Sequence, residues 1–144
     1  MNTRKVNTAL FAAYCALMLW LLFDRPGIVS GIPYWDQVAA RLNLVPFRTL
    51  HLFGSLLDSA RPEYVRAAVI NLGGNIVMFI PLGFFLPRVF DAVNNLQRTL
   101  LTTAAIITLV EIMQLFTLVG SCDIDDLILN VLGAAIGYWT HKQL

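Results

Sequence analysis

The residues of this chain best suited to chemistry are carboxylates and carboxamides that lie inside or beside apolar stretches. Such groups are costly to bury without partners, so we expect those of separate stretches to meet. Glu111 is the strongest candidate, because it is a single carboxylate deep in an apolar run that holds no Lys or Arg. The candidate ligand-binding residues are Asn71, Asn75, Glu111, Gln114, Asp123, Asp126 and Asn130.

Three of these residues are also catalytic candidates. Glu111 together with Asp123 or Asp126 could divide general-acid and general-base roles, because paired carboxylates do so when their surroundings differ. Their oxygen atoms would suit Mg²⁺, Ca²⁺ or Mn²⁺ rather than zinc, although no metal site or other cofactor is expected. Structural roles stay open as well: Asp123 as a helix N-cap with Asp126 in the first turn, and helix bridging by Asn71, Asn75 and Gln114.

Several function classes find no support in the sequence. No Ser-His, Cys-His or phosphate-cradling motif is present, which favours a binding protein over an enzyme without settling the question. The net charge is only +1 and no basic patch with interleaved aromatic residues appears, so nucleic-acid binding is not expected. The two cysteines, Cys15 and Cys122, are expected at depths that differ by about 12 Å and therefore not to pair.

The composition is that of an integral membrane protein, with 58% hydrophobic residues, 13% charged residues and a mean hydropathy of +0.69. Soluble domains have about a quarter of their residues charged. We predict an all-α membrane protein with one domain over residues 1–144, built as a four-transmembrane-helix bundle. The predicted spans are residues 6–23, 67–90, 100–119 and 126–139, of which the last is short. A kink or break is expected near Val77–Pro81, because Pro81 removes a backbone hydrogen bond.

The loop of residues 24–66 is predicted to carry two short interfacial helices. Trp35, Val38 and Leu42 share one helical face, and Leu50, Phe53, Gly54 and Leu57 share another. Neither piece could span a bilayer, and both suit the membrane interface, although a small soluble cap on the bundle is the alternative. Basic residues in short loops place both termini in the cytoplasm and the long loop outside: Arg4, Lys5, Arg88, Arg98 and Lys142.

With four spans, the polar residues of three helices fall in the same half of the bilayer. At about 1.5 Å per residue, they lie from the surface to about 12 Å deep. Spacings of three and four residues put those of each helix on one face. Gly133 and Gly137 form a G-x-x-x-G pattern that permits close helix contact. The sequence therefore predicts a tight inner half and a polar pocket in the outer half.

At these residues the sequence resembles the VanZ-like family of small bacterial membrane proteins. The matching segments are Asn43-Leu44-Val45-Pro46-Phe47, Asn71-x-x-x-Asn75 leading into Phe79-Ile80-Pro81-Leu82-Gly83-Phe84, and Glu111-x-x-Gln114 with Asp123-x-x-Asp126-x-x-x-Asn130-x-x-Gly133. The resemblance covers most of the chain after about Leu42. It implies a small helical bundle, and the family's namesake is linked to low-level resistance to teicoplanin, an antibiotic that acts on cell-wall precursors outside the membrane. The family pattern usually includes an arginine before the acidic pair, but Val119–Cys122 has none. Either an arginine of residues 25–66 replaces it, or the function of that arginine is lost.

Three functions compete on this basis. The favoured one is a multi-pass envelope protein that binds a lipid or lipid-linked cell-wall precursor in the outer pocket and contributes to glycopeptide resistance. The second is a membrane-embedded hydrolase or transferase, dependent on carboxylates or a metal, that acts on a lipid-linked substrate. The third is a small transporter, which is disfavoured because no inverted repeat is visible. The expected partners are membrane lipids and such a precursor, and the sequence leaves self-association open.

Overall fold

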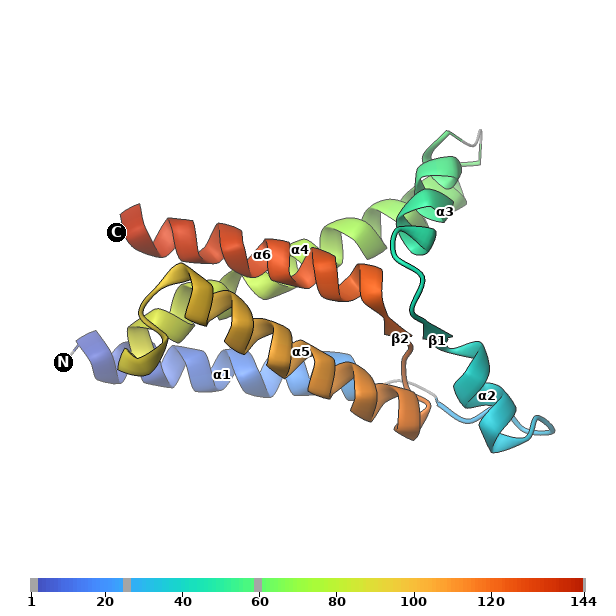
Figure 1. Cartoon of the computed structure of the whole chain (residues 1–144), viewed down its shortest axis with the longest axis horizontal. Coiled ribbons are helices and arrows are strands. Elements are labelled where there is room, and N and C mark those ends of the chain that lie inside the picture. The colour runs from blue at the N-terminus through green and yellow to red at the C-terminus, as the bar shows by residue number, and fades with distance from the viewer. Residues whose placement is uncertain (1–2, 25–26, 59–60, 144) are drawn as a thin grey trace.

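The computed structural model describes residues 3–24, 27–58 and 61–143. The elements are, in order, α1 (Thr3–Phe23), α2 (Tyr34–Ala40), β1 (Leu42–Asn43), α3 (Arg48–Leu57), α4 (Pro62–Val89), the 3₁₀ turn η1 (Asp91–Val93), α5 (Leu96–Thr117), β2 (Cys122–Asp123) and α6 (Ile124–Gln143). The four long helices α1, α4, α5 and α6 run along the molecule, with the start of α1 and the end of α6 at the same end (Figure 1). The short helices α2 and α3 lie at the other end. The all-α class is confirmed.

Helices α1, α4 and α5 are long and apolar enough to cross a membrane. Helix α6 has 20 residues, but its first turn carries Asp125 and Asp126 and its last turn carries His141 and Lys142. The apolar stretch between them is short, so α6 is not among the helices that are long and apolar enough to cross a membrane. The structure therefore supports a helical membrane protein with three candidate spans among the described residues, and the four-span bundle stays a prediction.

All three candidate spans begin earlier than predicted, and for α4 and α5 the first residues explain why. Pro62 lies in the first turn of α4, where its missing N–H is not needed, and Glu63 follows it near the positive end of the helix dipole. Asn95 caps α5, and its Oδ1 accepts a hydrogen bond of 2.9 Å from the backbone N–H of Arg98. Membrane hydropathy alone does not detect such starts.

Helix α4 continues through Pro81 and Pro87 over 28 residues, so of the expected kink or break near Val77–Pro81 the break does not occur, and the kink stays a prediction. The proline ring leaves the carbonyl of residue 77 without its usual donor. A neighbouring helix supplies a donor close by, because the Tyr14 hydroxyl of α1 donates to the Met78 carbonyl at 2.9 Å. Such side-chain donors let prolines persist inside membrane helices.

The close packing predicted for the G-x-x-x-G face is confirmed between α6 and α4. A Cβ atom at Gly133 or Gly137 would overlap the carbonyl oxygens of Ile76 and Ile80, and one at Gly83 would overlap the backbone of α6. Apart from this contact, the bundle has an apolar core in which side chains of α1, α4 and α5 pack together. Its buried members are Met18, Phe79, Leu82, Leu86 and Ile107.

The long loop forms two short helices close to the predicted places, and α2 packs on the end of α5. Val38 is buried against Leu115 and Leu118, and the Tyr34 hydroxyl donates to the Phe116 carbonyl at 2.8 Å. Helix α3 has no buried residue. The loop also forms a parallel two-residue strand pair that was not predicted, in which Asn43 is opposite Asp123.

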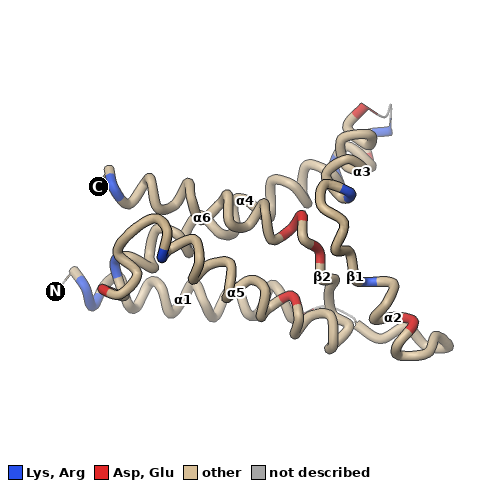
Figure 2. The backbone as a smooth tube through the Cα atoms, viewed as in Figure 1, with Lys and Arg blue, Asp and Glu red and all other residues tan. Residues whose placement is uncertain are grey.

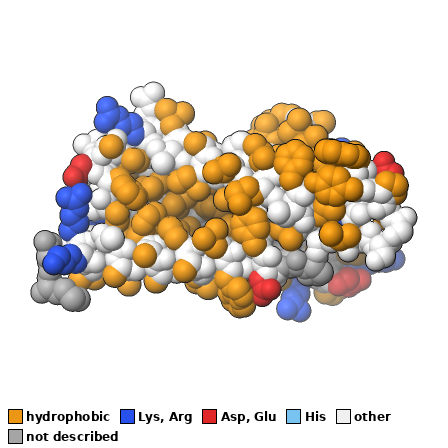
Figure 3. All heavy atoms as spheres, turned by 90° about the horizontal axis from the view of Figure 1, so that it is seen from below, with side chains coloured by type: hydrophobic (Ala, Val, Ile, Leu, Met, Phe, Trp, Pro, Cys, Tyr) orange, Lys and Arg blue, Asp and Glu red, His pale blue; other side chains and the backbone are white. Residues whose placement is uncertain are grey.

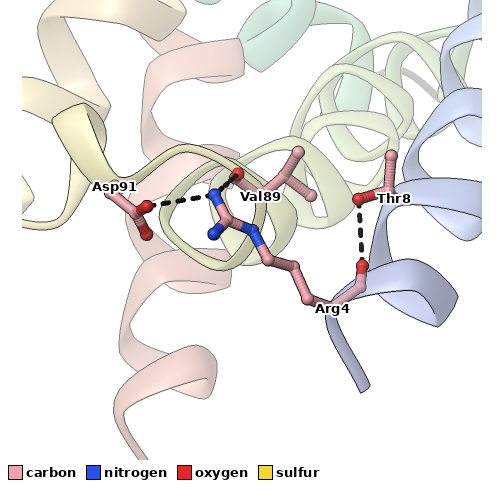
Figure 4. A network of polar contacts seen from close by, with 4 residues as sticks. All are labelled: Arg4, Thr8, Val89 and Asp91. Carbon is pink, nitrogen blue, oxygen red and sulfur yellow. Dashed lines mark hydrogen bonds and ion pairs between the residues drawn. The ribbon is translucent and has the colours of Figure 1, made fainter. Parts of the chain in front are cut away.

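The molecular surface fits an apolar surrounding. Apolar side chains cover most of the face seen in Figure 3. Lys and Arg lie towards the two ends of the molecule and not along the middle of the long helices (Figure 2). At the end that holds the start of α1, Arg4 donates to Asp91 Oδ2 at 3.0 Å and to the Val89 carbonyl at 3.3 Å, and so ties α1 to the end of α4 (Figure 4).

Candidate ligand-binding site

A cavity of about 430 Å³ lies among α1, α4, α5 and α6. Six of the seven candidate residues line it: Asn71, Asn75, Glu111, Gln114, Asp126 and Asn130. The apolar part of its wall includes Leu22, Ile70, Met78, Phe79, Ile107 and Val110. The convergence predicted from depth and helical phase is therefore present in the fold, and the ligand-binding role of these residues stays a prediction.

Glu111 is the most deeply buried acid of the cavity wall, with 6% of its surface exposed. Its Oε1 has no hydrogen-bond partner, and its Oε2 lies 3.9 Å from the Cys122 Sγ. An unpartnered carboxylate oxygen in such a place is unfavourable for folding. The position of Glu111 therefore carries a cost in stability that the described contacts of Oε1 do not offset.

Two carboxamides of the wall have the same property. Asn130 is 5% exposed, and its Oδ1 has no partner. The Oδ1 of Asn71, one helix away on α4, is also buried without a donor. Polar groups inside proteins normally have partners, so these amides provide unused hydrogen-bonding capacity on both sides of the cavity.

The remaining polar residues of the wall join helices. Asn75 Nδ2 donates to Asp126 Oδ1, which links α4 to the first turn of α6. Gln114 Nε2 donates to the Leu22 carbonyl at 2.8 Å, which links α5 to the end of α1. The bridging role considered for Asn75 and Gln114 is thus present, while both residues still face the cavity.

Asp123 does not line the cavity with the other candidates. Its carboxylate accepts hydrogen bonds from Asn43 Nδ2 at 3.1 Å, from the Thr49 hydroxyl and from the backbone N–H of Asp125 at 2.9 Å. The last bond is that of an N-cap at the start of α6. Both carboxylate oxygens of Asp123 accept hydrogen bonds from the loop or from the start of α6. The structure therefore favours the N-cap role for Asp123 over acid–base chemistry.

Asp125 was given no role by the sequence, yet it is the acid that fixes α3. It is fully buried, and its two carboxylate oxygens accept from the backbone N–H groups of Phe47, Thr49 and Leu50. These groups begin α3, whose own preceding residue, Phe47, offers no side-chain cap and has a left-handed φ of 66°. The family segment Asn43–Phe47 ends where these hydrogen bonds begin, but the sequence alone could not show that Asp125 is the residue it meets.

Cys122 lies in the loop beside Glu111. Both cysteines are free thiols, and Cys122 is half-buried. Burial first, and then the nearby carboxylates of Glu111 and Asp123, raises the pKa of the Cys122 thiol. It is therefore less nucleophilic at neutral pH than an exposed cysteine.

The described residues hold no group of three or more His, Cys, Asp and Glu side chains arranged to bind a metal ion. Among the described residues, no arginine lines the cavity in place of the one missing before the acidic pair. Arg41 donates to the Gly27 carbonyl at 2.6 Å, and Arg66 lines an open depression that shares Ala67 and Ile70 with the cavity. Arg25 lies outside the described residues.

These features define a small helical membrane protein with a polar cavity between its long helices. The chain belongs to the VanZ/LLP1 family, whose model matches residues 11–144. It is 26% identical over 134 residues to the protein VanZ of Enterococcus faecium, an alignment that covers 92% of this chain and 71% of that protein. No solved structure matches the chain. The resemblance seen in the sequence is thus confirmed.

Proposed function

We propose that the protein binds a membrane lipid or a lipid-linked cell-wall precursor, with the polar group of the ligand in the cavity lined by Glu111. The observation that carries this proposal is the wall itself, where Glu111 and Asn130 are buried and each has an oxygen without a partner. Ligand pockets are typically about 300–1,000 Å³, mostly apolar, with a few placed polar groups. A cavity of about 430 Å³ with both kinds of wall fits that description.

We further propose that the cavity lies in the outer half of the membrane, and the distribution of charge supports this orientation. The basic residues of the short connections and helix ends lie together at the end opposite the cavity: Arg4, Lys5, Arg88, Arg98 and Lys142. Basic residues of short loops favour the cytoplasm. In this arrangement α6 is the fourth span, both termini are cytoplasmic, and α2 and α3 lie at the outer interface, at the end of the bundle that holds the cavity.

This position gives a physical basis for a role in glycopeptide resistance. A protein that holds a cell-wall precursor at the outer surface would compete with an antibiotic for the same molecule. Teicoplanin, to which the family's namesake is linked, acts on such precursors. We therefore extend the proposal to a contribution to teicoplanin resistance.

The experiment is lipid retention by the purified full-length protein. Wild type, Glu111→Gln and Asp58→Asn would be extracted in mild detergent, and the retained lipids identified by mass spectrometry. Asp58 is an exposed loop acid, so its change controls for the loss of one negative charge. We expect a retained lipid in wild type and Asp58→Asn, and at least tenfold less in Glu111→Gln. Absence of retained lipid in wild type, together with no shift of its melting temperature on adding envelope lipids, would contradict the proposal.

A second function has one observation in its favour, since the carboxylates of Glu111 and Asp126 line the same cavity. Two acids in one site are the parts that a hydrolase or transferase needs. This alternative predicts that a bound lipid-linked substrate is converted during incubation, with or without added Mg²⁺. Recovery of the lipid unchanged, with no new product, favours the binding function.

A further inference from the structure

The acidic side chains of the cavity restrict its ligand. Among the described residues, its wall includes two carboxyl groups, those of Glu111 and Asp126, and no Lys, Arg or His. Three buried oxygens of the wall have no donor: Glu111 Oε1, Asn71 Oδ1 and Asn130 Oδ1. A group placed here should therefore bring positive charge and hydrogen-bond donors, and a phosphate would be repelled.

A primary ammonium group has these properties. It carries one positive charge, three N–H donors and no acceptor. The volume of about 430 Å³ and the apolar part of the wall also suit an organic ammonium better than a bare ion. Charge-assisted hydrogen bonds to a carboxylate are about twice as strong as neutral ones, which would compensate for burying Glu111.

A basic side chain lies in an open depression next to the cavity. Arg66 and Glu63 line this depression, which shares Ala67 and Ile70 with the cavity, and the Arg66 guanidinium has no hydrogen bond or ion pair with the described residues. Arg66 and Ile70 are four residues apart on α4 and hence on one helix face. An exposed arginine beside a negative cavity matches a headgroup with an inner ammonium and an outer phosphate.

We propose, building on the lipid-binding function above, that the cavity selects lipids whose headgroup carries a primary ammonium, with the lipid phosphate at Arg66. Glu111 Oε1, Asn71 Oδ1 and Asn130 Oδ1 accept its three N–H groups, and Asp126 supplies a second negative charge beside it. The same chemistry exists on a soluble molecule, phosphoethanolamine, so the source must be distinguished by experiment.

The test titrates purified full-length protein with matched ligands and measures affinity by native mass spectrometry and melting temperature. The probes are phosphatidylethanolamine, the same lipid N-acetylated, soluble phosphoethanolamine and Mg²⁺ alone. We expect phosphatidylethanolamine to bind at least tenfold more tightly than its N-acetylated form. Glu111→Gln and Asp126→Asn should abolish this preference, Arg66→Gln should weaken both lipids equally, and Asp58→Asn should change nothing.

The contrary outcomes separate the two proposals. Equal binding of both lipids would overturn the ammonium inference and leave lipid binding intact. Binding of neither lipid, nor of any other envelope lipid, would overturn both. Stabilisation by Mg²⁺ alone would mean that the cavity holds a metal, and equal affinity for soluble phosphoethanolamine would overturn the lipid as the source.

Discussion

Glu111 can be replaced by glutamine with little change of shape, which makes it the clearest test at the scale of single residues. Its Oε1 has no partner to lose, so Glu111→Gln should leave the protein folded with an unchanged or higher melting temperature. The same change should reduce lipid retention and any resistance phenotype, because it removes the charge. Glu111→Ala should in addition lower stability by about 1–3 kcal/mol, since the Cys122 thiol loses its acceptor and the buried methylene groups of the side chain are removed. Full phenotype in Glu111→Gln would make the residue a structural one.

Asp125 is expected to behave in the opposite way, with an effect on stability and none on ligand chemistry. Asp125→Ala leaves the backbone N–H groups of Phe47, Thr49 and Leu50 without their acceptor. Loss of such a cap costs about 1–3 kcal/mol, so the melting temperature should fall. Asp58→Ala is the control, and an equal fall in both variants would contradict the assigned cap.

The acids of the segment 123–126 also show what spacing can and cannot predict. Asp126 and Asn130 were placed on the cavity face by helical phase, and they line the cavity because both lie within α6. Asp123 was placed there by the same count, but it precedes the helix, where side-chain direction does not follow a period of 3.6 residues. Its direction is set instead by pairing with Asn43 far earlier in the chain, which no local pattern reports.

At the scale of helices, the contact of α6 with α4 is the feature most sensitive to added volume. Gly137→Ala would push a methyl group into the Ile80 carbonyl, and overpacking of this kind costs about 1–3 kcal/mol. Gly73→Ala, on α4 with open space around it, should instead be neutral or stabilise by about 0.5–1 kcal/mol. Thermal melting of both variants in the same detergent checks the pair, and similar behaviour of the two would contradict the close contact.

The elements themselves were largely predictable because hydropathy and length determine membrane helices. Helices α1, α4 and α5 were expected from apolar runs, and the G-x-x-x-G pattern indicated close packing. The pair β1–β2 was not predicted, because two residues are too few to show an alternating pattern. The continuity of α4 through Pro81 was missed for a related reason, since the helix that donates near the proline lies far away in sequence.

At the scale of the whole molecule, the proposed orientation in the membrane rests on the basic residues of the short connections and helix ends, which favour the cytoplasm. The start of α1 and the end of α6 lie at one end (Figure 1), and the cavity belongs to the other half of the bundle. If that half faces outward, an alkaline phosphatase fused after the last residue stays inactive, because it remains in the cytoplasm. High activity of the fusion would show that α6 does not cross the membrane or that the orientation is reversed.

The reactivity of the two cysteines tests whether the end of the bundle that holds the cavity faces outward. Cys122 lies in the loop between α5 and α6, next to the cavity wall, whereas Cys15 lies in the middle of α1. An impermeant maleimide added to intact cells should therefore label Cys122 and leave Cys15 unlabelled, as compared in the single variants Cys15→Ser and Cys122→Ser. Because burial raises the pKa of the Cys122 thiol, little thiolate is present at pH 7, and labelling should speed up as the pH rises through 8 and 9. Labelling of Cys15 with no labelling of Cys122 would reverse the depth assignment, and with it the outer position of the cavity on which lipid recognition depends.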